Sequence, residues 1–195
     1  MAASALPASL LPLLSRGSAA SPASSLPSLR PTQPHDATLH PTIEALSSPP
    51  SLRAMLHLLN DDLSSAHEIA QSDEGNPSSD LIHSILHRRE ADYWNSKWWL
   101  DQFRHPILPV VYEKQDYAEV RRSAKRFVDE VEALVGGKGR GGATTACGAQ
   151  KKMEELKRWQ WRELSLLAQH VLQECGLKAE GLEGGVAATA ATAPA

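Results

Sequence analysis

Apolar residues recur along most of this chain with the spacing of an α-helix. Leu52, Met55, Leu56 and Leu59 stand at i, i+3, i+4 and i+7, which places them on one helix face. Comparable patterns predict helices over residues 63–71, 80–104, 116–135 and 149–175. The chain therefore predicts an all-α fold, a compact bundle of about four to six helices.

Helix-breaking and capping residues indicate where these helices begin and end. Ser78 or Ser79 can cap the helix over 80–104, and a break is expected near residues 91–92. Pro106 and Pro109 end that helix and predict an extended link through residues 110–112. We find no internal repeat with a period of 20–50 residues in the sequence.

Composition divides the chain into one domain and two tails. Nine of the 13 prolines lie within residues 1–50 among Ser and Ala, a composition that offers little apolar surface to offset ordering entropy. We therefore expect residues 1–41, the N-terminal arm, to be disordered. The Gly- and Ala-rich tail at 179–195 is expected to be disordered too, which leaves a helical domain over 42–178 with a Gly-rich loop at 136–148.

Charge and apolar runs exclude two kinds of partner. The chain has 20 Lys and Arg against 23 Asp and Glu, a net charge of -3, so binding to nucleic acid through bulk positive charge is not expected. No run of about 18 apolar residues predicts a membrane span. A cytoplasmic location is expected; mitochondrial targeting is the alternative, supported by Arg16 and Arg30 but opposed by Pro7 and Pro12.

A stripe of histidines and a carboxylate carries the strongest indication of chemistry. At about 100° per residue, His83, His87, Glu90 and Trp94 share one helix face at the edge of the apolar face. Two histidines one turn apart can reach one ion, and Glu90 can be a third ligand. A further ligand could come from His67 and Glu68 on the preceding helix, or from Glu163, His170 and Glu174, which share a stripe on the last helix. The sequence thus predicts a site for a divalent transition metal at His67, His83, His87 and Glu90.

The same stripe also fits two roles that need no metal. In metal-free acid–base catalysis of a small-molecule reaction, His87 and His67 would transfer protons and Glu90 would orient them. Alternatively, the histidines form a structural polar network at the edge of the core. An enzyme is therefore one hypothesis among several.

Residues around the stripe are candidates for binding a substrate. Arg88 or Arg89 could hold an anionic group in bidentate geometry, although an intramolecular ion pair with a nearby carboxylate is the alternative. Trp94 could stack on a planar ligand, and Asp92 and Asn95 supply further polar groups.

The stretch around these residues resembles a known family. The string His83-x-x-x-His87-Arg88-Arg89-Glu90-x-Asp92-Tyr93-x-Asn95-x-Lys97-Trp98-Trp99, with residues 66–71, looks like a motif of short bacterial and fungal proteins that have no assigned activity. The resemblance covers roughly residues 52–108. It implies a shared site around His67, His83, His87, Glu90, Asp92 and Asn95, and its fungal members suggest, by analogy, fungal biosynthetic chemistry.

A protein without catalytic activity is the second functional hypothesis. The helix over 149–175 is amphipathic and carries Lys151, Lys152, Lys157 and Arg158. In this hypothesis its apolar face, from Met153 to Val171, is exposed and packs on a partner protein.

Overall fold

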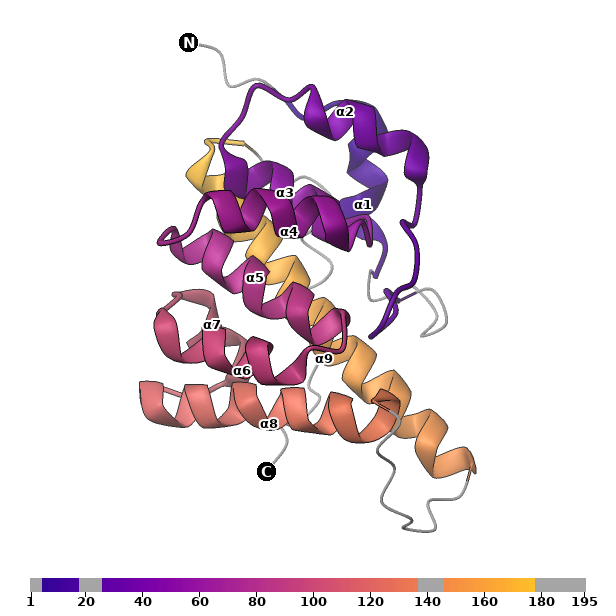
Figure 1. The fold of residues 1–195 in the computed structure, drawn as a ribbon, viewed down its shortest axis with the longest axis vertical. Helices are drawn as coiled ribbons and strands as arrows, with labels where there is room; N and C mark the ends of the chain where they lie inside the picture. The colour runs from indigo at the N-terminus through magenta and orange to yellow at the C-terminus, as the bar shows by residue number, and fades with distance from the viewer. Residues whose placement is uncertain (1–4, 18–25, 137–145, 178–195) are drawn as a thin grey trace.

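The computed structural model describes residues 5–17, 26–136 and 146–177, and these segments contain helices and no β-strand (Figure 1). The all-α fold is confirmed. Six helices of the described segments have ten or more residues: α3 (Pro50–Leu59), α4 (Leu63–Ser72), α5 (Pro77–Arg89), α6 (Tyr93–Gln102), α8 (Tyr117–Val135) and α9 (Ala146–Glu174). The shorter ones are α1 (Leu11–Ser15), α2 (His40–Glu44) and α7 (Ile107–Tyr112). None of the described helices is long and apolar enough to cross a membrane.

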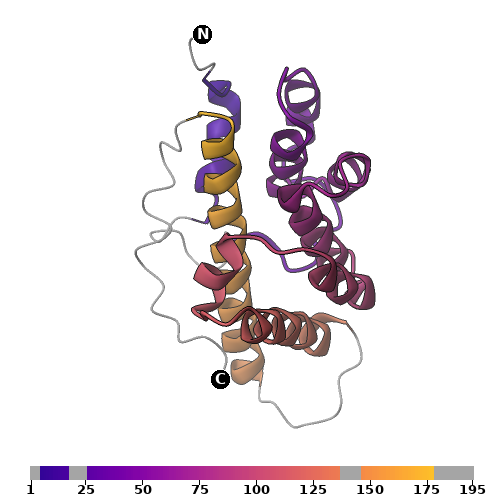
Figure 2. The same cartoon turned by 90° about the vertical axis from the view of Figure 1, so that its left-hand side faces the viewer.

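The helices form two layers around one core. Helices α3 to α6 follow one another as antiparallel neighbours in one layer, and α9 runs along their side with α1 and α7 (Figure 2). Helix α8 crosses one end and contacts α6, α7 and α9. The buried apolar side chains of both layers form a single cluster, so the domain has one core.

Side-chain caps start most of the long helices. Asp62, Asp92 and Asp116 cap α4, α6 and α8 by accepting a hydrogen bond from a backbone N–H of the first turn. Helix α5 begins at Pro77 with Asn76 as its cap, which is earlier than the start at Ser78 or Ser79 expected from the sequence. The break expected near 91–92 is the turn between α5 and α6.

The extended link predicted through residues 110–112 is wrong, because this segment belongs to the short helix α7. Pro106 is its N-cap residue with φ -64°, and Pro109 is its third residue. The first turn of a helix needs no intrahelical N–H donors, so both prolines fit there without losing a hydrogen bond. Glu113, with φ 53°, then ends α7 in the left-handed conformation.

The hairpins α3–α4 and α5–α6 are two copies of one structural unit, 30 residues apart. In both turns the N-capping Asp also donates its backbone N–H to the carbonyl five residues earlier: Asp62 to His57 at 3.0 Å, and Asp92 to His87 at 2.8 Å. Residue 61 has φ 58° and its equivalent, residue 91, has φ 70°. This repeat was missed in the sequence, because the two units share a backbone and an apolar pattern but few identical residues, among them His57/His87 and Asp62/Asp92.

The N-terminal arm is not disordered over residues 5–17 and 26–41, which pack into the core. Leu10, Leu13, Leu14, Leu26 and Leu29 are each at most 5% exposed. The prolines break the arm into short pieces, but its leucines still supply an apolar surface to bury, and burial of about 1.5–3 kcal/mol per leucine offsets the ordering entropy. The disorder expected for residues 1–4 and 18–25 lies outside the described residues.

Polar contacts also fasten the arm. Arg16 pairs with Asp61 at 2.8 Å and donates to the carbonyl of Leu59 at the end of α3. Gly17 lies against the ring of Trp161 on α9, where a Cβ would clash with the indole, so only glycine fits there.

Helix α9 is longer than expected and its apolar face is covered. It begins at Ala146, inside the loop expected over 136–148, and most of that loop lies outside the described residues, as does the tail at 179–195. Leu156, Leu164, Leu167 and Val171 are at most 1% exposed. The apolar face expected to bind a partner is therefore used inside the chain, and this expectation is wrong.

Candidate metal centre

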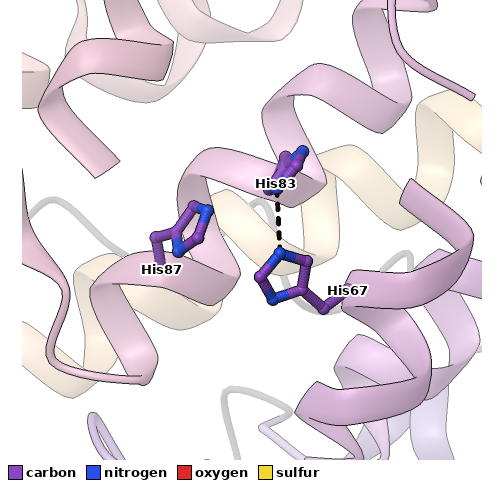
Figure 3. Close-up of side chains that lie close together, drawn as sticks. All are labelled: His67, His83 and His87. Carbon is purple, nitrogen blue, oxygen red and sulfur yellow. Dashed lines mark hydrogen bonds between the residues drawn. The ribbon is translucent and has the colours of Figure 1, made fainter. Parts of the chain in front are cut away.

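Three histidines from two helices meet at the predicted site. His67 projects from α4, and His83 and His87 project from successive turns of α5 (Figure 3). One ring nitrogen from each lies within 4.8 Å of the other two, and Nε2 of His67 is 3.2 Å from Nε2 of His83. His83 and His87 are buried, whereas the His67 side chain is 31% exposed. The packing of α4 against α5 explains the placement, because it brings His67 to the two histidines of α5.

Glu90 joins this histidine cluster at its outer edge. Its Oε2 is 3.5 Å from Nδ1 of His67 and 3.5 Å from Nδ1 of His87. Burial alone would raise the pKa of Glu90, but the hydrogen bond from His87 and the charge of His67 hold it below its ordinary value. The carboxylate is therefore ionised near neutral pH, where it can orient two ring nitrogens or bind a cation.

His83 is the deepest of the three histidines. Its ring stacks on Trp99 at 4.2 Å and on His87 at 4.8 Å between centroids. Burial, followed by the neighbouring His87 and His67, lowers the pKa of His83 to about 4. The imidazole is neutral near pH 7 and keeps a lone pair, which is the state that binds a metal ion.

Asp92 and Asn95 lie beside His87. Asn95 Nδ2 is 3.1 Å from Nε2 of His87, and Asp92 Oδ2 is 3.9 Å from Nδ1 of the same ring. Trp94 is 72% exposed and contributes to a neighbouring cavity of about 470 Å³. The other residues lining this cavity are Arg30, Ala91, Asp92, Tyr93, Lys97, Glu132 and Gly136. Asp92 thus lies between the cavity and the histidine cluster.

Arg88 and Arg89 are not placed to bind a substrate. Arg88 pairs with Glu163 on α9, and Arg89 pairs with Asp61 and donates to the carbonyl of Leu58. Their side chains are 2% and 0% exposed, so neither guanidinium is free to meet a ligand. Both arginines form intramolecular ion pairs, which was the alternative, and their partners lie further away in the sequence than expected. Glu163 is thereby engaged with Arg88 and is not a fourth metal ligand.

His170, another candidate fourth ligand, lies in a different group. Its ring faces His105 at 4.7 Å between centroids, and its Nε2 is 3.4 Å from Glu174. Ser78 joins them, because its hydroxyl donates to Glu174 at 3.1 Å and lies 3.2 Å from Nε2 of His105. Since the backbone N–H of Ile107 donates to Nδ1 of His105, no carboxylate orients that ring as in a hydrolase triad.

One further cluster, formed by His40, His57 and Asp62, was missed in the sequence. One ligand atom from each lies within 4.8 Å of the others. The signal in the sequence is the spacing from His57 to Asp62, which equals the spacing from His87 to Asp92. His40, in the arm expected to be disordered, could not be placed without the fold.

No protein-family model, curated protein or solved structure matches this chain. The protein is a helical protein whose histidine and aspartate groups could hold a metal ion.

Proposed function

We propose that the protein binds a divalent transition metal at His67, His83 and His87 and uses it on a small-molecule substrate. The observation that supports the proposal most strongly is the convergence of three imidazole nitrogens within 4.8 Å from two helices. Two nitrogens bound to one zinc ion at about 2.0–2.1 Å with tetrahedral geometry lie roughly 3.3 Å apart. The 3.2 Å between the Nε2 atoms of His67 and His83 fits that spacing.

The surrounding groups fit a metal site better than a purely structural network. Two Nε2 atoms facing each other can share only one hydrogen bond, and Nδ1 of buried His83 has no hydrogen-bond partner among the described residues. Metal-bound histidines commonly direct their second ring nitrogen to a carboxylate, which fixes the ring. Glu90 lies near Nδ1 of His67 in that position.

The chemistry of such a site follows from its ligands. Three imidazole ligands from His67, His83 and His87 would leave a position for water, and a zinc ion held there would lower the pKa of that water to about 7. His67 and Glu90 are partly exposed, so water and a substrate reach the site from their side. We infer a metal-dependent hydrolytic or Lewis-acid reaction on a small molecule, with the cavity beside Asp92 and Trp94 as the place for the rest of the substrate.

Native mass spectrometry with Zn²⁺, Mn²⁺ and Fe²⁺ tests the metal site. Wild-type protein should retain an ion that His67→Ala does not, because one of three ligands is lost. His67 is the suitable position, since its partial exposure leaves the fold intact. His35→Ala, which removes an exposed histidine outside both clusters, is the matched control and should bind like the wild type.

Trp99 gives an independent signal, because it stacks on His83. Titration with Zn²⁺ should change its fluorescence in the wild type and not in His67→Ala. If His67→Ala retained every ion and the same fluorescence response, the cluster would be a structural polar network and the proposal would be wrong.

A further inference from the structure

We propose that His40, His57 and Asp62 form a second divalent-metal site, with Glu44 orienting His57. The three ligands come from α2, from the last turn of α3 and from the cap of α4. Nδ1 of His57 and Nδ1 of His40 both lie 3.0 Å from Oδ2 of Asp62. Two histidines and one carboxylate form a ligand set of catalytic zinc sites and of non-haem iron sites.

The surroundings of His57, whose side chain is 0% exposed, support this site most strongly. Its Nε2 lies 2.8 Å from Oε1 of Glu44, while its Nδ1 faces Asp62. A neutral imidazole has one N–H and one lone pair, so it can donate to only one of two carboxylates. The lone pair of the other nitrogen then faces a carboxylate oxygen, and the two repel each other. A cation bound by both atoms removes this repulsion.

Glu44 is suited to be the outer carboxylate. Its second oxygen, Oε2, accepts from Nη1 of Arg53 at 3.2 Å, which holds the carboxylate in place. If Nε2–H of His57 donates to Glu44, then Nδ1 is left with its lone pair towards Asp62. This is the arrangement by which a carboxylate orients a metal-bound histidine.

The internal repeat places the second cluster at a position equivalent to that of the first. His57 and Asp62 occupy the positions that His87 and Asp92 occupy 30 residues later. In both cases a histidine on the helix before the unit faces the repeated histidine. The ring centroids of His40 and His57 are 5.2 Å apart, and those of His67 and His87 are 4.8 Å apart. Both units thus place a pair of histidine rings at the equivalent position, and the first cluster adds His83 whereas the second adds Asp62.

The second site differs in its access to solvent. The His40 side chain is 49% exposed, and Ser65 Oγ lies 3.4 Å from its Nδ1. His40 is more exposed than His67, which is 31% exposed and is the outermost histidine of the first site, so water would reach a metal bound here more readily. We therefore expect faster metal exchange at the second site.

Native mass spectrometry with Zn²⁺ tests the proposal on the full chain, with His35→Ala as control. Wild type and His35→Ala should bind two ions, and His40→Ala and His67→Ala should bind one each. The double variant should bind none. His40 is exposed, so its replacement leaves folding intact, and far-UV circular dichroism checks this.

The outcomes separate the two sites. If His40→Ala still bound two ions, or if the wild type bound one ion that only His67→Ala lost, the second site would be refuted. A single wild-type ion lost only in His40→Ala would support the second site and refute the proposed function. No binding would refute both sites.

A second variant examines Glu44 in the His67→Ala background, where only the second site remains. Glu44→Ala should weaken Zn²⁺ binding by about 10–100-fold, the usual effect of removing an outer carboxylate. An unchanged Kd would overturn the role of Glu44. Asp62→Asn, which retains a capping oxygen for α4, should also lose the ion, and retention would overturn the ligand assignment.

Discussion

Arg88 on α5 and Glu163 on α9 form an ion pair with 2.6 Å between Nη2 and Oε2, and each side chain is 2% exposed. Tyr112 donates its hydroxyl to the other carboxylate oxygen at 3.3 Å, and the ring of Phe127 faces the guanidinium at 4.6 Å. Burial and the charge of Glu163 raise the pKa of Tyr112 well above its ordinary value, so its hydroxyl remains a donor. This pair joins the two layers of the fold.

Glu163→Gln should lower the free energy of unfolding by about 3–5 kcal/mol, because it leaves a buried guanidinium without a counter-charge. Urea unfolding followed by circular dichroism measures the loss. Glu113→Gln is the control, since Glu113 pairs with Arg162 at the surface, and such pairs contribute about 0–1 kcal/mol. Equal losses in both variants would show that burial does not decide the strength of these pairs.

Leu13→Ala tests whether the N-terminal arm belongs to the core in solution. Leu13 is 1% exposed, so the substitution should destabilise the protein by about 2–5 kcal/mol. Leu11, two residues earlier and 44% exposed, is the matched position, and Leu11→Ala should change the melting temperature little. An arm detached from the domain would give the same melting temperature for both variants.

Ala91→Gly should stabilise the protein by about 0.5–1 kcal/mol. Ala91 has φ 70°, a conformation that strains any residue with a Cβ and that glycine adopts freely. Ala133→Gly, at an exposed position of α8, should instead destabilise, because glycine weakens a helix interior. Thermal unfolding compares the two, and a lower melting temperature for Ala91→Gly would contradict the strain argument.

His105 should make stability depend on pH. Burial, and then the nearby His170, lower its pKa from 6.5 to about 3. The unfolded chain therefore binds a proton at His105 as pH falls below about 6.5, while the folded chain does not until about pH 3. Between about pH 6.5 and pH 3, stability therefore decreases as the pH is lowered, by up to about 1.4 kcal/mol per pH unit for this group.

His105→Asn keeps an acceptor for the backbone N–H of Ile107 and removes this titration. Its unfolding free energy, measured in urea at pH 7, 6 and 5, should decline less steeply than that of the wild type. Its absolute stability at pH 7 is not the criterion, because the contact with Ser78 is also lost. Parallel declines would mean that folding does not lower the pKa of His105.

The sequence predicted the long helices because their apolar faces carry the helical period directly. It failed where tertiary contacts decide the conformation. Pro106 and Pro109 read as breakers of a helix, yet they start one, and the leucines of the arm read as too few to order a Pro-rich segment. The residues of α3 and α9 that the arm contacts lie far from it in the sequence, so no local pattern reveals these contacts.

The two histidine clusters differ in how far the sequence could predict them. His83, His87 and Glu90 share a helix face, and His67 lies on the helix directly before it. Local helix geometry was therefore enough to predict the first cluster. The second cluster needs His40, which only the packing of α2 on α3 brings to His57. Arg88 and Arg89 were ambiguous for a similar reason, since Glu163 lies 75 residues beyond Arg88.

The contact between Gly17 and Trp161 has a consequence for how the chain is made. The arm leaves the ribosome long before α9, yet its leucines and Gly17 fit against surfaces that α9 completes. During synthesis those leucines stay uncovered while the two hairpins, whose contacts are local, can already pair. Newly made chains should therefore complete their core only after the last helix has emerged.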